Sequence, residues 1–240
     1  MTNRHRIQVT DDESIAAVHH SASSTRWIVF CHGFRSDKSG SYERRARRAV
    51  DAGFNAVRFD FRGCGDSDGR FVDQTLSAKL DDLAAVVDTF DPDSLVLFGS
   101  SFGGKVAVHA TARDRVAPVA IATRAPVTVN AAFDEYRSIA RRDGVYRFDD
   151  GREIDRGFFE DLATYPVAEL VDGLDDVPVA IFHGRADDSV PIEHSLETVT
   201  LLEIDVMIDI YAGEGHIFSD SANERVLDRL FGWLATLDQH

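Results

Sequence analysis

The chain has 240 residues, enough to bury a full core, and we expect a single domain over residues 1–240. Its 41 acidic residues against 26 basic ones give a net charge of −15, which argues against nucleic acid as a partner. No apolar run is long enough to cross a bilayer, and the first residues lack the apolar core of a signal peptide. We therefore expect a soluble, cytoplasmic protein with no membrane partner.

The kinds of charged residue also carry information. Lysine occurs only at Lys38, Lys79 and Lys105, while arginine is plentiful and aspartate far outnumbers glutamate. Such a surface repels itself in dilute buffer, but at molar salt the Debye length falls to about 3 Å and the repulsion is largely removed. The composition resembles that of proteins from extreme halophiles. An ordinary acidic protein is the alternative, and the scarcity of lysine favours the halophilic one.

The two cysteines give no sign of a metal site or a disulfide scaffold. Cys31 and Cys64 lack C-x-x-C spacing, and no histidines accompany them at a spacing typical of zinc sites. We expect both thiols to be reduced and structural.

Strand-like and helix-like patterns alternate along most of the chain. We predict strands at 7–9, 15–19, 27–31, 55–59, 95–98, 116–122, 179–183 and 206–211, and helices at 42–52, 76–90, 104–111, 192–201 and 223–237. This alternation predicts an α/β protein with a mostly parallel central sheet and helices on both faces. The first two strands are expected to form an antiparallel hairpin at its edge.

The alternation fails between residues 124 and 176, where charged and aromatic residues mix without a regular period. Long insertions into compact domains are usually functional, so we expect a small cap inserted over the site. A loop and helix pair that only packs on the edge of the sheet is the alternative.

Residues 95–104 read L-V-L-F-G-S-S-F-G-G, an apolar strand that ends in G-x-S-x-G and opens into a helical pattern. A nucleophilic serine at a sharp strand-to-helix turn has this context. The strained backbone of such a turn requires small neighbours, which Gly99, Gly103 and Gly104 supply. Ser101, rather than Ser100, is therefore the candidate nucleophile.

A serine hydroxyl is a poor nucleophile until a histidine accepts its proton and a carboxylate orients that histidine. Asp187 follows the predicted strand at 179–183, and His216 follows the one at 206–211. Nucleophile, acid and base in this order, at successive strand ends, are typical of serine hydrolases. Asp188 could be the acid if the loop were shifted by one residue, but the spacing to Val190 and Pro191 favours Asp187.

Together, four motifs resemble those of α/β-hydrolases, in particular capped serine esterases and serine aminopeptidase-like hydrolases, including the cinnamoyl and feruloyl esterase-like group. The motifs are His32-Gly33-Phe34, the segment D-F-R-G-C-G-D-S-D-G at 60–69, the turn around Ser101, and H-G-x-x-D-x-x-V-P at 183–191. The resemblance implies an α/β-hydrolase fold with Ser101 as nucleophile, Asp187 as acid and His216 as base.

The oxyanion formed during acyl transfer needs N–H donors already in place, each contributing about 2.7 to 4 kcal/mol. The backbone amides of Phe34 and Phe102 are the candidates. Phe102 follows the nucleophile at the start of a helix, and Phe34 leaves the strand that ends at His32-Gly33.

Other polar residues have simpler interpretations. His32 and His183 lie at strand ends and are expected to be hydrogen-bonded structural residues. The run from Glu43 to Arg48 is typical of the solvated face of a helix, with an i,i+4 pair between Glu43 and Arg47.

Three arginines, Arg35, Arg62 and Arg124, could lie near the mouth of the site. Pairing with the abundant acidic residues is the expected role, although one of them could bind a substrate carboxylate.

The sequence thus predicts a serine hydrolase that cleaves carboxylic esters of small acyl substrates through an acyl-enzyme, with no cofactor and no metal. A thioesterase or a small-peptide hydrolase would use the same residues. A protein that binds a ligand under the cap with little turnover is the rival from another class, and the complete set of candidate residues argues against it. A haloalkane dehalogenase is disfavoured. The resemblance implies that this branch of the superfamily carries an aspartate at the nucleophile position, where this chain has Ser101.

Overall fold

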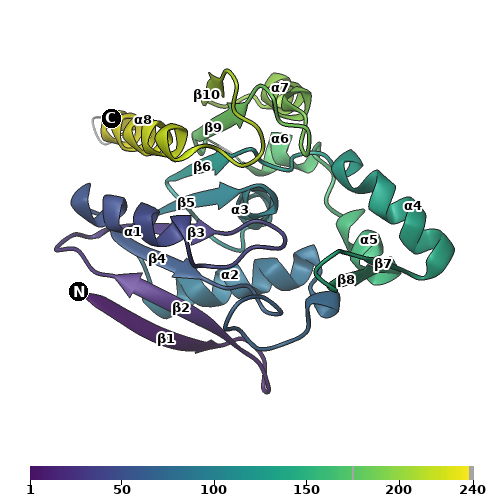
Figure 1. Cartoon of the computed structure of the whole chain (residues 1–240). Helices are drawn as coiled ribbons and strands as arrows, with labels where there is room; N and C mark the ends of the chain where they lie inside the picture. Colours follow the sequence, from purple (N-terminus) through teal and green to yellow (C-terminus); the bar gives the residue numbers. More distant parts are fainter. Residues whose placement is uncertain (175, 238–240) are drawn as a thin grey trace.

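The structure is a computed structural model that describes residues 1–174 and 176–237, and one twisted sheet forms its centre (Figure 1). The eight strands of this sheet in the described ranges are β1 (Thr2–Gln8), β2 (Ser14–His20), β3 (Arg26–Cys31), β4 (Asn55–Phe59), β5 (Ser94–Ser100), β6 (Ala120–Arg124), β9 (Val179–Gly184) and β10 (Val206–Tyr211). Their order is β1-β2-β4-β3-β5-β6-β9-β10. Within this sheet the pairs β1–β2 and β2–β4 are antiparallel and the other pairs are parallel, which confirms the α/β class and the edge hairpin.

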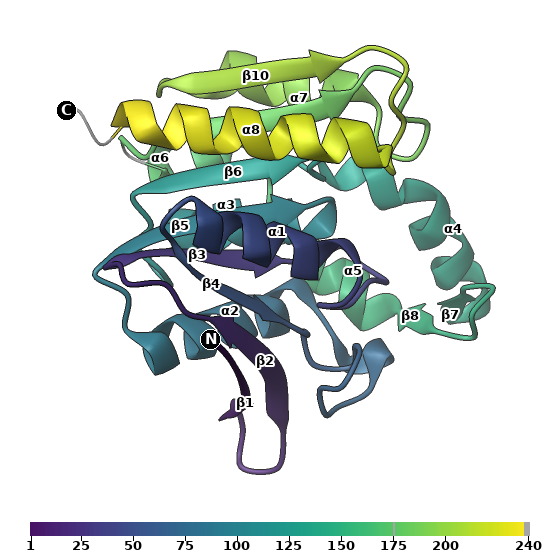
Figure 2. The same ribbon diagram turned by 60° about the vertical axis from the view of Figure 1, so that its left-hand side comes forward.

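Helices cover both faces of the sheet (Figure 2). The helices α2 (Leu76–Phe90), α3 (Phe102–Ala112) and α7 (Ile192–Leu201) lie on one face, and α1 (Ser41–Asp51) and α8 (Asp220–Leu237) lie on the other. Because successive strand side chains point to opposite faces, β3 contributes Val29 to the first core and Ile28 and Phe30 to the second. The near-continuous apolar strands are thus explained by burial on both sides.

Most predicted elements are confirmed, and two strand boundaries are wrong. The strand expected at 116–122 is β6, which begins only at Ala120; Pro118 has no N–H to donate to a neighbouring strand. The strand expected at 7–9 is β1, which already begins at Thr2. Four of its first five residues are exposed, so an apolar alternation could not reveal it.

The residues between β6 and β9, 125–178, are called here the inserted segment. Its elements are η2 (Asn130–Phe133), α4 (Asp134–Asp143), the β7 (Val145–Arg147) and β8 (Glu153–Asp155) hairpin, α5 (Arg156–Leu162) and α6 (Glu169–Gly173). Figure 1 shows α4, β7 and β8 beyond the end of the sheet toward which β5 and β6 point. Phe133, Phe158 and Leu162 belong to the same buried cluster as Phe102 of α3, so the segment shares the core of the sheet.

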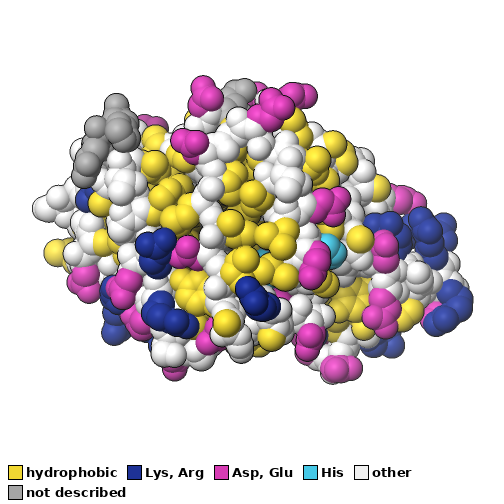
Figure 3. All heavy atoms as spheres, turned by 90° about the horizontal axis from the view of Figure 1, so that it is seen from above, with side chains coloured by type: hydrophobic (Ala, Val, Ile, Leu, Met, Phe, Trp, Pro, Cys, Tyr) yellow, Lys and Arg dark blue, Asp and Glu magenta, His cyan; other side chains and the backbone are white. Residues whose placement is uncertain are grey.

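No helix in the described ranges is both long and apolar enough to cross a membrane. The face seen from above in Figure 3, which carries β10, α7 and α8, shows hydrophobic side chains across its middle. Leu196 and Leu201 of α7 and Ile210 of the edge strand β10 are 39–41% exposed. This apolar face therefore lies along the edge of the sheet.

Candidate active site

Ser101 occupies the turn between β5 and α3, with φ +53° and ψ −120°. A side chain rarely adopts a positive φ, so the surroundings must hold this conformation in place. A Cβ on Gly103 would lie 2.2 Å from the carbonyl oxygen of Cys31, and one on Gly99 would lie 2.3 Å from that of Gly103. The tight contact between β5, β3 and the start of α3 therefore requires glycine at both positions.

His216 and Asp187 lie in the two loops predicted from the sequence; His216 contacts Ser101, and Asp187 contacts His216. His216, in the loop after β10, has its Nε2 3.0 Å from Ser101 Oγ. Its Nδ1 lies 2.8 Å from Asp187 Oδ2, in the loop after β9. A carboxylate can only accept, so Nδ1 carries the ring proton and Nε2 is free to accept the proton of Ser101. The structure thus brings all three sequence-predicted side chains into one hydrogen-bonded chain.

Asp187 is fixed by its own loop. Its Oδ1 accepts hydrogen bonds from the backbone N–H groups of Ser189 and Val190, at 2.9 and 2.8 Å. Burial by itself would raise the pKa of Asp187, but hydrogen bonds from His183, His216 and Val190 outweigh it and hold this pKa well below its usual range. The neighbouring Asp188 is exposed to solvent. Of the two carboxylates, only Asp187 contacts His216.

The two amides expected to bind an oxyanion lie beside Ser101. A Cβ on Gly33 would be 3.4 Å from the Cβ of Ser101, so the backbone that enters Phe34 passes close to the nucleophile. Phe102 is the first residue of α3, where N–H groups have no helical acceptor. Within the described ranges, neither the Phe34 nor the Phe102 amide donates to a protein acceptor. Both remain available to a bound ligand.

His32 and His183 are buried, hydrogen-bonded residues, in agreement with the sequence analysis. His32 accepts from the N–H of Phe61 at 3.1 Å and donates from Nδ1 to its neighbour Gly33 at 2.8 Å. Burial lowers the pKa of His32 to about 3, so the ring is neutral. His183 contacts the Ser195 hydroxyl at 2.8 Å and the Val190 carbonyl at 2.9 Å, and thereby supports the loop of Asp187.

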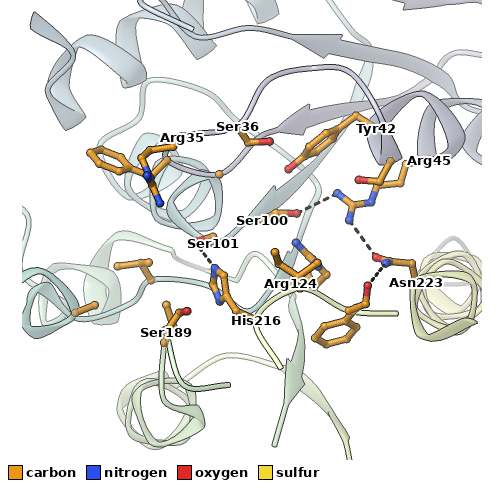
Figure 4. Close-up of a pocket in the computed structure, with 18 of the residues that line it drawn as sticks. Arg35, Ser36, Tyr42, Arg45, Ser100, Ser101, Arg124, Ser189, His216 and Asn223 are labelled. Atoms are coloured by element: carbon orange, nitrogen blue, oxygen red, sulfur yellow. Dashed lines mark hydrogen bonds between the residues drawn. The ribbon is translucent and has the colours of Figure 1, made fainter. Parts of the chain in front are cut away.

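A cavity of about 540 Å³ opens over Ser101 and His216. Figure 4 shows these two residues in its middle, with Arg35 on one side and Arg45 and Asn223 on the other. The side next to the inserted segment is mostly apolar and aromatic; its residues are Phe34, Val127, Ala132, Phe133, Tyr136 and Phe148. The opposite side, next to α1 and α8, is polar and includes Tyr42, Arg45, Ser100, Arg124 and Asn223. The cavity therefore has two chemically different halves.

The interpretation of residues 43–48 as a solvated helix face is wrong for two residues, Arg45 and Ala46, which are buried. Arg47 does pair with Glu43, as expected, but Arg45 is only 3% exposed. It shares the buried face of α1 with Tyr42, Ala46 and Ala49. That i, i+3, i+4 and i+7 spacing was the available signal, because it places position 45 beside the apolar stripe.

The three arginines expected near the mouth lie in different places. Arg62 is buried away from the cavity and pairs with Asp82 and Glu13, at 2.6 and 3.0 Å. Arg35 and Arg124 line the cavity. Tyr136 and Phe148 of the inserted segment also line it, and no spacing in the sequence relates them to Ser101. Aromatic content alone could indicate a pocket there, without saying which rings line it.

Comparison with known proteins identifies the family. The chain belongs to the alpha/beta hydrolase family, whose sequence model matches residues 28–229. It is 26% identical over 228 residues to the mitochondrial palmitoyl-protein thioesterase ABHD10 of Pongo abelii, which covers 88% of this chain and 74% of the relative.

Solved structures show the same fold. Est1E from Butyrivibrio proteoclasticus, solved with ferulic acid bound, superposes with a TM-score of 0.85 at 23% identity, over 98% of this chain and all of that one. A putative hydrolase from Agrobacterium vitis S4 gives a TM-score of 0.81 at 25% identity, over 99% and 98% of the two chains. The predicted fold and superfamily, with esterase-like relatives, are confirmed.

Proposed function

We propose that this chain is a serine hydrolase that cleaves acyl esters of small substrates through an acyl-enzyme. The observation that carries the proposal is the hydrogen-bonded chain from Ser101 through His216 to Asp187 at the base of the cavity. Nucleophile, base and orienting carboxylate are recognised by this geometry and these roles. The hydrolase family of the chain and its esterase and thioesterase relatives agree with it.

In this mechanism Ser101 Oγ attacks the acyl carbon while its proton passes to Nε2 of His216. Asp187 keeps the proton of His216 on Nδ1 and stabilises the imidazolium that forms. The N–H groups of Phe34 and Phe102 hold the negative oxygen of the tetrahedral intermediate. The imidazolium protonates the leaving group, and a water molecule activated by His216 then releases the acid from Ser101.

We further propose that the inserted segment acts as a cap that forms one wall of the substrate site. Its residues Phe133, Tyr136 and Phe148 line the cavity beside Ser101. An apolar wall binds the hydrocarbon part of an acyl group by removing it from water. No residue of the mechanism requires a cofactor or a metal.

A thioester substrate is the second candidate. The observation that favours it is the similarity to the palmitoyl-protein thioesterase ABHD10, which extends over 88% of this chain. The same attack by Ser101 would cleave either bond, and the difference would lie in the leaving group. None of the relatives described above is named as a peptide hydrolase or as a non-catalytic binding protein, so the comparisons give these two alternatives no comparable support.

Labelling with a fluorophosphonate, followed by an ester panel, tests the proposal. A working nucleophile should react covalently at Ser101, and the protein should hydrolyse 4-nitrophenyl butanoate and a matched butanoyl thioester. Replacing Ser101 by alanine should abolish labelling and lower kcat by several orders of magnitude, up to about 10⁶-fold. The ratio of ester to thioester rates would separate the two candidate substrates.

Ser138→Ala is the matched control, because Ser138 lies on the exposed side of α4 and its hydroxyl only contacts the Asp134 carbonyl. It should retain wild-type labelling and rate. Adding His216→Ala to Ser101→Ala should cost little more than either change alone, since the two residues act as one unit. Full activity in Ser101→Ala would remove the assignment, and a protein that binds acyl compounds without turnover would support the non-catalytic alternative.

A further inference from the structure

Arg124 places a guanidinium in the cavity with no acidic partner. It ends β6, next to Ser100, and its side chain lines the cavity together with Ser101 and His216 (Figure 4). No hydrogen bond or ion pair joins its guanidinium to any residue in the described ranges, and its Nε is buried without a partner. Its guanidinium carbon lies 5.3 Å from the centroid of the Phe218 ring. This side chain is therefore free to bind a ligand.

Arg45 adds a second guanidinium on the same side of the cavity. It is held by neutral groups only: the Ser100 hydroxyl at 3.1 Å, the Asn223 side-chain oxygen at 3.2 Å and the ring of Tyr42 at 4.6 Å. Asn223 is itself fixed, since its amide group donates to the Phe218 carbonyl at 2.9 Å. Arg45 is thus fixed in place without being neutralised.

The contrast with the other arginines of the same cavity is informative. Arg35 pairs with Asp150 at 3.5 Å, and Arg44 pairs with Asp220 at 2.8 Å. In a chain with 41 acidic residues, carboxylates were available for Arg45 and Arg124 as well. A buried charge without a partner is destabilising, so its retention beside Ser101 suggests that a ligand supplies the missing anion.

Both arginines remain cationic at neutral pH. Burial, followed by repulsion from Arg45, lowers the pKa of Arg124 to about 10, and burial also lowers the pKa of Arg45. Other ionisable groups near the pair are Tyr42, Arg44 and Asp187. Arg44 already pairs with Asp220, and Asp187 is already bonded to His216. The planar fork of a guanidinium matches the two oxygens of a carboxylate or phosphate group.

We propose that the substrate of this site carries a carboxylate or phosphate group that binds Arg124, with Arg45 adding to the positive potential. Ser101 lies between the arginines and the aromatic wall of the inserted segment. The anion and the apolar part of the substrate therefore lie on opposite sides of the bond that is cleaved. The inference rests on the hydrolase function proposed above and narrows its substrate class.

Matched pairs of aryl esters test the inference and locate the anion. The first pair is 4-nitrophenyl hydrogen glutarate and its methyl ester, with the charge on the acyl side. The second is 3-carboxyphenyl butanoate and its methyl ester, and the third is 3-phosphonooxyphenyl butanoate and its dimethyl ester, with the charge on the leaving group. For at least one pair, wild-type kcat/KM should favour the anionic member by about tenfold or more.

Arg124→Gln should remove that preference by lowering kcat/KM for the anionic ester about 10- to 100-fold, with less than about threefold change for its neutral partner. Arg124→Lys should retain part of the preference. Arg142→Gln, which removes an exposed arginine on α4 that pairs with Asp143, is the charge-matched control and should keep the wild-type ratio. Circular dichroism confirms that each variant is folded.

The inference is overturned if the wild-type protein prefers no anionic ester, a result that needs no variant. It is also overturned if folded Arg124→Gln slows both members of the preferred pair equally. If no ester is cleaved and no fluorophosphonate label appears on Ser101, the proposed function itself fails, which is a distinct result. Competitive inhibition of neutral-ester cleavage by inorganic phosphate at constant ionic strength would support the phosphate form.

Discussion

The turn that carries Ser101 and the inserted segment both line one cavity, but different interactions hold the two regions in place. Around Ser101 the backbone determines the arrangement: Gly99 and Gly103 stand where any Cβ would overlap a carbonyl group. In the inserted segment, ring contacts hold the structure, for example Phe133 and Phe158 against Phe34 at 5.3 and 5.2 Å. Close backbone contacts allow only glycine at such positions, whereas apolar packing tolerates several types of side chain.

The two regions are joined at the residues proposed to bind the oxyanion. The backbone amides of Phe34 and Phe102 are free beside Ser101, while their side chains pack against the inserted segment. Phe102 contacts Phe133 at 5.5 Å and Phe158 at 6.0 Å. The position of the inserted segment is thereby coupled to the position of the proposed donors. This difference between the turn at Ser101 and the inserted segment can be tested in four ways.

The largest effect on the reaction rate is expected at Asp187. It and Asp188 are adjacent carboxylates in one loop, but only Asp187 is hydrogen-bonded to His216. Asp187→Asn should lower kcat by about 10⁴-fold, because an amide favours the wrong tautomer of His216. Asp188→Asn is the matched control and should change the rate by less than about twofold, since Asp188 is exposed and does not contact His216. Steady-state kinetics with 4-nitrophenyl butanoate measure both. The reverse order would move the acid by one residue.

A second prediction compares one substitution in each region. Gly103→Ala should cost about 3 kcal/mol or more of unfolding free energy, because its Cβ would lie 2.2 Å from the Cys31 carbonyl. Phe158→Leu, in the inserted segment, should cost about 1 to 2 kcal/mol, since a leucine fills most of the space left by the ring. Urea unfolding measures both, with labelling of Ser101 as a check on the site. Equal costs would contradict the distinction between backbone and side-chain control.

At the boundary between the two regions, a buried lysine should make the stability of the protein depend on pH. Lys105 of α3 is fully buried, and its Nζ lies 3.3 Å from the Tyr165 carbonyl and 3.4 Å from the Thr128 carbonyl of the inserted segment. His109 is 3.2 Å away, and Glu169 lies beyond it. Burial lowers the pKa of Lys105 to about 7.

The sign of this effect follows from proton linkage. Between pH 7 and 10 the unfolded chain keeps the Lys105 proton that the folded chain has lost, so stability should rise with pH across this window. The contribution of Lys105 should be on the order of 1 to 3 kcal/mol, and Lys105→Met should remove that part of the rise. The buried Lys79, whose pKa burial also lowers, contributes in the same direction and stays in the variant. Urea midpoints measured from pH 6 to 10 test the prediction. A wild-type curve that is flat or falls, or a variant with the same rise, would contradict it.

The smallest effect concerns the surface that both regions share. The charge of −15 should make the protein more stable and more active in molar KCl or NaCl than at low salt, because counterions screen the repulsion. Sulfate should stabilise more than chloride at equal ionic strength, since it also strengthens apolar burial. Thermal midpoints in both salts measure the two contributions. An unchanged or lower midpoint in molar salt would contradict the halophilic interpretation of the composition.

The amino-acid sequence alone determined the sheet, the family resemblance and the candidates Ser101, Asp187 and His216. These features depend on local patterns: alternation of apolar residues, glycines at a strained turn, and polar residues after buried strands. Parallel strands place their carboxyl ends at one edge, so loops far apart in the chain meet there. The sequence therefore predicted which residues would come together, although not at what distance.

Only the tertiary structure decided how the cavity is lined. The aromatic wall comes from the inserted segment, and the burial of Arg45 depends on how α1 packs against α8 and the end of β5. Whether Arg124 pairs with an acidic residue or faces an open cavity is a matter of which side chains surround it in three dimensions. Long-range packing is not encoded in any short pattern, because each contact joins residues from separate elements whose relative positions the whole core sets.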